Sequence, residues 1–361
     1  MDSAENEYQP LRAVDPGGGV ESASALPQPG DLAVPPFVRG ERTVPERDAR
    51  DYRETEREQA DDWGPPREDL DRRTLLLAAL ALVASLTIAV ATSGLALSPD
   101  RFLLVLLAPA LVLGRARRYL RDFAPFAVML VVYAQCRGIA HLLSPHPYYQ
   151  PQLDAEKFLF FGHVPSVDLQ NWLWTGAHHW YDTITFAVTR IHFIVPPLVA
   201  FALWMRRRAL FYRFAATMIV LSMVGALTFW AFPAAPPWAA AKRTMIEVQR
   251  LPTPQGAVGT KAVSIGHYNV SRLIEPNPYA AVPSLHAGYS FFVFLFVVTV
   301  LWSTRWRWWA LGLGAVYPLA QSFAVVYTGN HYVVDLLIGF AYAAAALFGV
   351  RWFWRKRGFP E

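Results

Sequence analysis

Two histidines and one aspartate have the spacing of an acid–nucleophile pair at a membrane surface. His331 and Asp335 are four residues apart at the start of an apolar run, so a helix places both on one face. A carboxylate in this position accepts the imidazole Nδ1–H, fixes the tautomer and leaves Nε2 free. His286 occupies the matching position at the start of another apolar run. One histidine can then attack phosphorus while the other protonates the leaving oxygen.

The residues before His286 are typical of a helix start. Ser284 in the N-cap position leaves the backbone N–H groups of the first turn directed at the site, where they can bind an anion. The structural alternatives stay open at this point. His331 and Asp335 can simply join two helices, and Pro283–Ser284 can be a plain helix cap beside an interfacial histidine.

The composition is that of an integral membrane protein. Of the 361 residues, 54% are hydrophobic and only 17% are charged, whereas a soluble enzyme carries about a quarter charged residues. Basic clusters lie at the ends of long apolar runs, so the net charge of +5 is not the footprint of a nucleic-acid partner. The single cysteine, Cys136, excludes an intramolecular disulfide.

The apolar runs predict an all-α polytopic protein with about eight transmembrane helices. They lie at 74–97, 101–114, 123–143, 183–205, 209–232, 284–302, 308–328 and 331–351. With eight spans the basic clusters share one side, which predicts cytoplasmic termini in a plasma-membrane protein and an extracytoplasmic site for His286 and His331. Residues 1–70 are rich in Gly, Ser, Pro and mixed charge and predict a disordered cytoplasmic tail before a membrane domain at 71–357.

The histidine motifs resemble a known family. "PSLHAG" at 283–288 and "HYVVD" at 331–335 resemble the second and third motifs of the type 2 phosphatidic acid phosphatase (PAP2) superfamily. "FPAAPPW", "RIHFIVPP" and "LDAEKFLFFGHVPSVDLQNWL" resemble its Aur1-type branch, the inositolphosphotransferases and inositol phosphorylceramide synthases. The resemblance covers roughly residues 120–350. It implies a six-helix core, a phosphohistidine on His331, orientation of that ring by Asp335, and general acid–base catalysis by His286, without a metal or other cofactor.

The sequence departs from the broader superfamily at its phosphate-binding residues. The first motif, with its Lys and Arg-Pro, is absent, and Ala324 and Val325 stand where Ser-Arg is usual. Phosphoryl transfer requires charge neutralisation at the phosphoryl oxygens, so other residues must provide it. The candidate cations are Lys242, Arg243, Arg250, Lys261 and Arg272, each with the alternative of a solvated loop charge. The candidate hydrogen-bonding residues are Ser284, Tyr279, Tyr327 and Asn330.

These features predict an enzyme that acts on a membrane lipid phosphoester. Transfer to a small alcohol or polyol is the inositolphosphotransferase-like reaction, and transfer to water is the alternative lipid phosphatase reaction. A lipid transporter or scaffold is the non-enzymatic alternative, because intramembrane ionisable residues also line transport paths. His192, inside the fourth run, is interpreted as a packing residue, with pocket lining as the alternative. No motif specifies an oligomer.

Overall fold

The computed structural model describes residues 71–93, 99–143, 146–251 and 279–359. Within these ranges the chain forms helices and two isolated backbone bridges, and no β-strand. The helices are α2 (Arg72–Ser93), α3 (Pro99–Val112), α4 (Ala116–Leu143), α5 (Gln150–Leu159), α6 (Pro165–Leu173), α7 (Trp180–Ile191), α8 (Val195–Arg206), α9 (Arg208–Ala231), α10 (Pro237–Ala241), α11 (Leu285–Leu301), α12 (Arg307–Tyr327) and α13 (Val333–Lys356). The predicted disordered tail, residues 1–70, lies outside the described residues.

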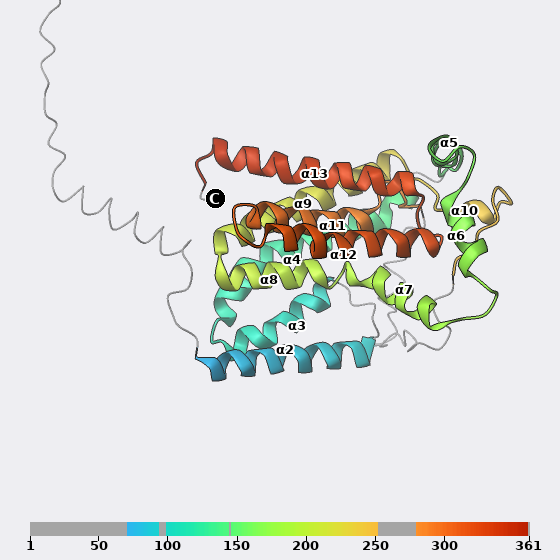
Figure 1. Cartoon of the computed structure of the whole chain (residues 1–361). Helices are drawn as coiled ribbons and strands as arrows, with labels where there is room; N and C mark the ends of the chain where they lie inside the picture. The colour runs from blue at the N-terminus through green and yellow to red at the C-terminus, as the bar shows by residue number, and fades with distance from the viewer. Residues whose placement is uncertain (1–70, 94–98, 144–145, 252–278, 360–361) are drawn as a thin grey trace, which may run out of the picture. The chain divides into compact units, whose positions relative to one another are not determined.

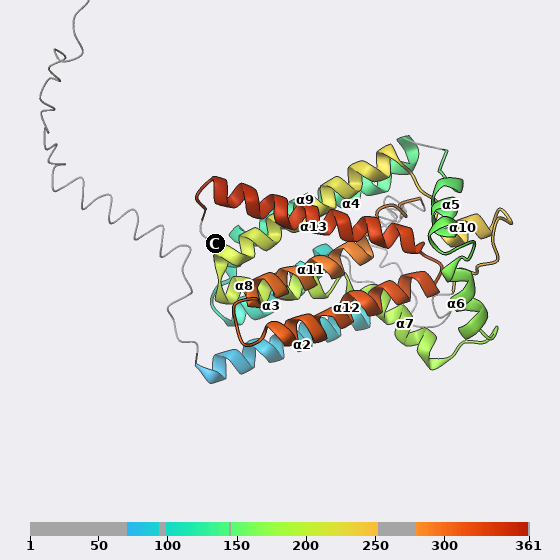
Figure 2. The ribbon, with the colours of Figure 1, turned by 45° about the horizontal axis from the view of Figure 1, so that its top comes forward.

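The long helices run side by side, and the short helices α5, α6 and α10 gather at one end of them (Figure 1). We call this the capped end. At the opposite end α4, α9 and α12 begin with arginines, and α8 and α13 finish with basic residues, so we call it the basic end. Helix α11 lies among α8, α9, α12 and α13, as a second view also shows (Figure 2). The all-helical prediction is therefore confirmed for the described residues.

Four helices are long and apolar enough to cross a membrane, namely α2, α9, α12 and α13. The pair α7 and α8 makes a fifth span if it is counted as one broken helix. Two shorter apolar helices, Leu103–Val112 and α11, fall below that length. The described residues thus provide four or five candidate spans, and the larger count of eight and the six-helix core stay predictions.

The predicted continuous span at 183–205 is broken in the structure. Helices α7 and α8 meet at an angle of 47° around residues 192–194. The physical reason is the pair Pro196–Pro197 in the first turn of α8. Proline lacks the N–H that would continue the helix, and its ring disfavours helical backbone in the preceding residue. The break places His192 at the helix junction rather than inside a continuous helix.

A buried ion pair joins three helices at the basic end. The carboxylate of Asp122 on α4 accepts N–H bonds from Arg208 of α9, the shortest at 2.8 Å, and from Trp204 Nε1 of α8 at 2.8 Å. The Tyr212 hydroxyl donates to the other carboxylate oxygen at 2.9 Å. Both charged side chains are buried. In the sequence Arg208 is one of three consecutive loop arginines, whereas in the structure its side chain lies inside the helix bundle.

Replacing Asp122 with alanine is expected to destabilise the bundle by about 3–5 kcal/mol, because it leaves the Arg208 charge buried and unpaired. The measurement is the thermal unfolding midpoint of the purified protein in detergent. Arg206→Ala is the matched control, since Arg206 is an exposed charge two residues away. Equal midpoints for the two variants would contradict a stabilising function of the pair.

Candidate active site

A tight turn between α12 and α13 sets the position of His331. Gly329 has a φ of +70°, and a Cβ there would lie 2.7 Å from a Val248 side-chain carbon, so the turn requires glycine. Helix α13 then begins with its own cap, because the Asp335 carboxylate accepts the Tyr332 N–H at 2.9 Å. Asp335 is therefore fixed from two directions, by the helix start and by His331.

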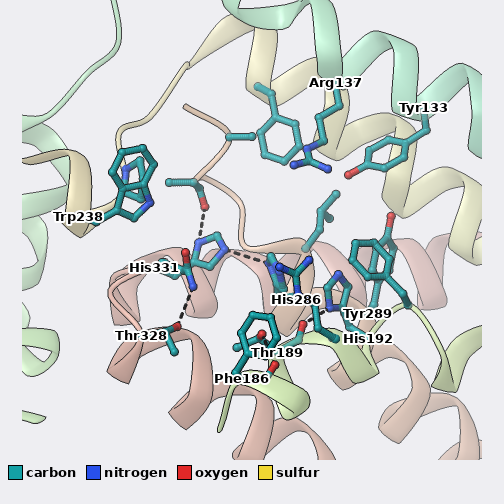
Figure 3. A pocket seen from close by; sticks show the side chains of 18 of the residues that line it. Tyr133, Arg137, Phe186, Thr189, His192, Trp238, His286, Tyr289, Thr328 and His331 are labelled. Atoms are coloured by element: carbon teal, nitrogen blue, oxygen red, sulfur yellow. Dashed lines mark hydrogen bonds between the residues drawn. The ribbon is translucent and has the colours of Figure 1, made fainter. Parts of the chain in front are cut away.

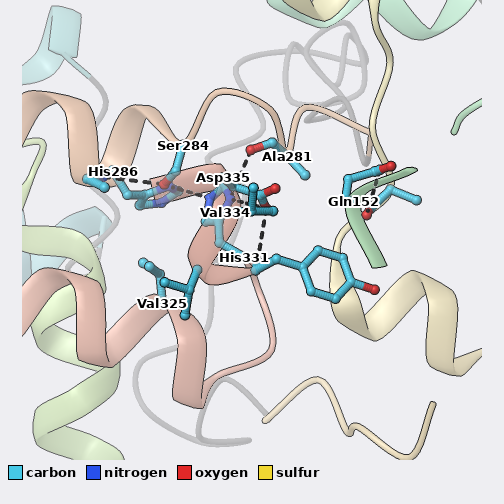
Figure 4. Close-up of polar contacts among 12 residues, drawn as sticks. Gln152, Ala281, Ser284, His286, Val325, His331, Val334 and Asp335 are labelled. Carbon is cyan, nitrogen blue, oxygen red and sulfur yellow. Dashed lines mark hydrogen bonds and ion pairs between the residues drawn. The ribbon is translucent and has the colours of Figure 1, made fainter. Parts of the chain in front are cut away.

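The hydrogen bonds of His331 determine its tautomer. Its Nδ1 lies 3.1 Å from the Ala281 carbonyl oxygen and 3.4 Å from Asp335 Oδ2 (Figure 4). Both partners only accept, so Nδ1 carries the proton and Nε2 has a free lone pair. Such an imidazole can act as a nucleophile, because positive charge that develops on the ring lies next to a buried carboxylate. The expected pairing of His331 with Asp335 is present in this geometry.

His286 faces that lone pair from the first turn of α11. Its Nδ1 lies 3.1 Å from His331 Nε2, although the two residues are 45 positions apart. Glycine at 339 permits this approach of α11 to α13, because a Cβ there would overlap the Ser284 carbonyl oxygen. With Nε2 of His331 as acceptor, Nδ1 of His286 is the donor. The structure thus brings together the three residues that the spacing singled out.

Both histidines line a cavity of about 580 Å³ between the helices (Figure 3). Its walls are largely apolar and include Leu130, Phe193, Met218 and Phe229. Three arginines also line it, Arg137 from α4, Arg190 from α7 and Arg250 from the segment after α10. Among the described residues none of the three has an acidic partner within salt-bridge distance. A cavity with three guanidinium groups beside two imidazoles suits an anionic ligand.

A buried glutamine holds Arg250 at the cavity. Gln170 of α6 donates from Nε2 to the Gln249 carbonyl at 2.9 Å and to the Tyr327 carbonyl at 2.8 Å. Its Oε1 accepts the Gln249 N–H at 2.9 Å. These bonds tie the segment before Arg250 to the end of α12. The guanidinium of Arg250 also stacks on the Trp238 ring, 4.6 Å from its centroid.

The other predicted phosphate-binding residues have different positions. Lys242 stacks on Trp238 and Arg243 on Tyr149, and neither lines the cavity. Tyr279 hydrogen-bonds with Tyr149, also away from the cavity lining. Arg272, like Lys261, lies outside the described residues. Of these candidates Asn330 lines the cavity, where its Nδ2 donates to Thr328 Oγ1 at 2.7 Å.

Ser284 acts as the cap of α11. Its buried hydroxyl oxygen accepts the Ala287 N–H at 3.4 Å, as the sequence predicts for an N-cap residue. The side chain itself does not line the cavity, whereas the next two residues, Leu285 and His286, do. Any anion bound at this helix start would therefore meet backbone N–H groups rather than the serine hydroxyl.

Two arginines of the cavity were missed in the sequence, and one of its histidines was interpreted as a packing residue with pocket lining as the alternative. Arg137 lies inside the predicted span 123–143, and Arg190 inside 183–205, where an ionisable residue by default indicates function. That signal is present in the sequence, whereas the predicted cations all lie in the outer loops. His192 lines the cavity with its ring centroid 4.1 Å from that of His286, and its Nδ1 donates to the Thr189 carbonyl at 2.6 Å. The structure therefore agrees with the pocket-lining alternative for His192.

Comparison with known proteins agrees with this geometry. A family model described as the PAP2 superfamily matches residues 153–348, more than half of the chain and the part that carries both histidines. The chain belongs to the PAP2 superfamily. No solved structure shows significant similarity to it.

Two curated relatives place this PAP2-superfamily protein beside the Aur1-type branch, which confirms the resemblance. The phosphoinositol dihydroceramide synthase of Bacteroides thetaiotaomicron is 26% identical over 173 residues, which cover 46% of this chain and 55% of the relative. The inositol phosphorylceramide synthase catalytic subunit aur1 of Schizosaccharomyces pombe is 25% identical over 255 residues, covering 66% of this chain and 55% of the relative. The chain thus matches about half the length of each relative.

In this PAP2-superfamily chain a carboxylate from α5 binds the start of α13. Glu156 is fully buried, and its two oxygens accept the N–H groups of Val333 and Val334, each at 3.0 Å. Burial raises the pKa of the Glu156 carboxyl above its ordinary value, while the two N–H donors act in the opposite direction. The Glu156 carboxylate thereby joins helix α5, at the capped end, to the turn that carries His331.

Replacing Glu156 with alanine is expected to lower the catalytic rate at least about tenfold and to lower the unfolding midpoint. The change leaves two buried N–H groups without acceptors, each costing about 1–3 kcal/mol, and frees the first turn of α13. Activity and thermal midpoint are measured on the same preparation. Asp154→Ala is the control, because Asp154 is an exposed carboxylate two residues away that bonds only Gln150 in the described structure. A Glu156→Ala variant that matches this control would contradict the assignment.

Proposed function

We propose that the protein transfers a phosphorylated headgroup from a membrane phospholipid to an alcohol through a phosphohistidine on His331. The observation that carries this proposal is the 3.1 Å contact between His331 Nε2 and His286 Nδ1 on a cavity lined by three arginines without acidic partners among the described residues. The names of the relatives support an inositolphosphotransferase-like reaction, in which the headgroup is a phosphopolyol.

In the first step His331 Nε2 attacks phosphorus, and the bond from phosphorus to the lipid oxygen breaks. His286, as an imidazolium, donates its Nδ1 proton to that oxygen, which leaves as a lipid alcohol. In-line displacement places the leaving oxygen on the far side of phosphorus from Nε2. Entry of the phosphoryl group must therefore open the His286–His331 hydrogen bond. Asp335 stabilises the positive charge that develops on His331.

In the second step an acceptor hydroxyl loses its proton to His286 and attacks the phosphorus. The new oxygen–phosphorus bond forms as the nitrogen–phosphorus bond to His331 breaks, which restores the neutral imidazole of His331 and the imidazolium of His286. A lipid alcohol, a polyol or water can fill the acceptor position chemically. The largely apolar walls of the cavity favour an acceptor that enters from the membrane. Water as the acceptor would give the alternative lipid phosphatase reaction.

The proposal also includes an orientation of the protein in the membrane. His286 and His331 lie at the capped end, and the arginine-rich helix ends lie at the opposite end of the bundle. The positive-inside rule then supports a cytoplasmic basic end and an extracytoplasmic site, with both termini in the cytoplasm. The substrate phosphate would be drawn from the outer leaflet.

Replacing Arg250 with methionine is expected to lower kcat/KM for the phospholipid donor roughly 100-fold, because a charged donor to the phosphoryl oxygens is lost. Lys242→Met is the matched control. Both cations stack on Trp238, but Lys242 does not line the cavity. Equal losses of kcat/KM in the two variants would indicate that stacking on Trp238, and not the charge of Arg250 at the cavity, is required for activity.

The decisive assay for the function uses the purified protein in lipid vesicles. The donor is phosphatidylinositol with a radiolabelled phosphate, and the vesicles contain a lipid alcohol as acceptor. Transfer predicts a new labelled lipid that retains the headgroup. Label that appears only in water-soluble products would identify hydrolysis, and an unchanged donor would argue against both reactions.

A further inference from the structure

A third imidazole packs against His286 from the break between α7 and α8. The ring centroids of His192 and His286 lie 4.1 Å apart, with an angle of 55° between the ring planes, and both rings line the cavity (Figure 3). His192 is buried and directly follows the last residue of α7. The phosphoryl-transfer steps assign it neither a proton nor a contact with phosphorus, so its place beside the proposed acid is not accounted for by those steps.

The end of α7 fixes the orientation of the His192 ring. The Phe193 N–H, which would continue the helix to the Thr189 carbonyl, donates instead to the Arg190 carbonyl at 3.1 Å. The Thr189 carbonyl accepts the Nδ1–H of His192 at 2.6 Å and, more distantly, the Nε2–H of Gln321 on α12 at 3.4 Å. A carbonyl oxygen only accepts, so Nδ1 of His192 carries a proton. The ring is thereby tied to α7 and, through this carbonyl, to α12.

His286 loses one of its two ring contacts when a substrate enters. In the structure its Nδ1 is held by the 3.1 Å bond to His331 Nε2. That bond must open during the reaction, because phosphorus takes the place next to Nε2. Within the described ranges the two rings in contact with His286 are those of His331 and His192, so His192 is the ring contact that phosphorus does not displace. A general acid must still be held within hydrogen-bond reach of its target.

We propose that His192 is a positioning residue that holds the His286 imidazole in place for proton donation to the leaving oxygen. This inference rests on the proposed transfer reaction. His192 exchanges no proton in the step, since His286 Nδ1 gives its proton to the lipid oxygen as the oxygen–phosphorus bond breaks. Misplacement of a catalytic group by about 1 Å can lower a rate about 100-fold. Loss of the His192 ring should therefore slow the step that needs the acid.

The test compares two donors that share a phosphoinositol headgroup and differ in the leaving alcohol. The leaving oxygen of phosphatidylinositol requires a proton, whereas the 4-nitrophenyl ester of the same headgroup releases a phenolate that needs no acid. Single-turnover release is measured with the protein in excess and without acceptor, which isolates the first step. His192→Ala should release diacylglycerol from phosphatidylinositol roughly 10- to 100-fold more slowly than the wild type. Its release of nitrophenolate should change by less than about threefold, because that release bypasses the acid.

His146→Ala is the matched control, since His146 is exposed and lies outside the cavity lining, and it should match the wild type with both donors. If His192→Ala does not fold, His192→Phe is judged by the same criterion, because it fills the space of the ring and lacks the Nδ1–H that the Thr189 carbonyl accepts. A merely structural His192 would slow release from both donors equally. That result, or unchanged release from both donors, would overturn the proposal.

His286→Ala separates this inference from the proposed function. It should show the same selective loss with phosphatidylinositol, to a larger extent. If it does so and the His192 variants do not, His192 has no positioning function and the proposed transfer reaction stands. If His286→Ala slows release from both donors equally, His286 is not the acid, and the proposed mechanism fails together with this inference.

Discussion

Replacing His331 with alanine is expected to reduce phosphoryl transfer by about four orders of magnitude or more. Loss of a covalent nucleophile removes the intermediate itself, and residual activity then comes only from binding and charge stabilisation. The expected loss depends on Nε2, which has the free lone pair because Nδ1 faces two acceptors. The measurement is the initial rate of label transfer in vesicles at saturating donor.

His163→Ala is the matched control for this experiment. His163 also pairs with an aspartate, Asp168, at 3.4 Å, the same separation as between His331 and Asp335. That pair is exposed on α6 and its loop, outside the cavity lining. The control should retain wild-type activity. A His331→Ala protein that folds normally and keeps more than about a tenth of the activity would rule out a nucleophilic His331.

Replacing Asp335 with asparagine is expected to lower kcat by about 10³–10⁴, as loss of the carboxylate does in other histidine-dependent sites. The amide can still accept the Tyr332 N–H through its oxygen, so the helix cap is largely preserved. Its NH₂ group, however, then faces His331 Nδ1 and favours the tautomer that protonates Nε2. The developing charge on the ring also loses its carboxylate partner.

The rates of Asp335→Asn and of the exposed control Asp168→Asn are compared under the same conditions. The Ala281 carbonyl also accepts from His331 Nδ1, at 3.1 Å. A loss of less than about tenfold in Asp335→Asn would show that this carbonyl alone is sufficient to fix the tautomer, and Asp335 would then have no orienting function. An unfolding midpoint close to that of the wild type would show that the effect is on catalysis rather than on folding.

The positions of the two candidate histidines were predictable because each is marked by local sequence. His331 and Asp335 share a helix face by spacing alone, and Ser284 marks the start of the helix that carries His286. The starts of two apolar helices at one end of the bundle then bring the imidazoles together. That convergence requires a glycine at 339, whose importance is visible only when the carbonyl of Ser284 is seen beside it.

The arginines of the cavity were harder to predict because tertiary packing brings them together. Arg250 reaches the cavity through Gln170, which is 80 positions away in the chain and gives no spacing signal. Arg190 lines the cavity next to the break between α7 and α8. The Pro196–Pro197 pair does signal that break. Local sequence pattern therefore predicted that His331, Asp335 and His286 lie together, whereas the arginines reach the cavity only through the way separate segments fold back.

A covalent intermediate on His331 is the central claim, and trapping it is the most direct test. The wild-type protein is mixed with donor phospholipid labelled in the headgroup phosphate, without acceptor, quenched in alkali and digested for mass spectrometry. We predict an acid-labile, alkali-stable adduct on the peptide that contains His331, absent from His331→Ala, and discharged when acceptor is added before the quench. Rapid turnover with no adduct at any time, or with an adduct on His286 instead, would contradict a nucleophilic His331.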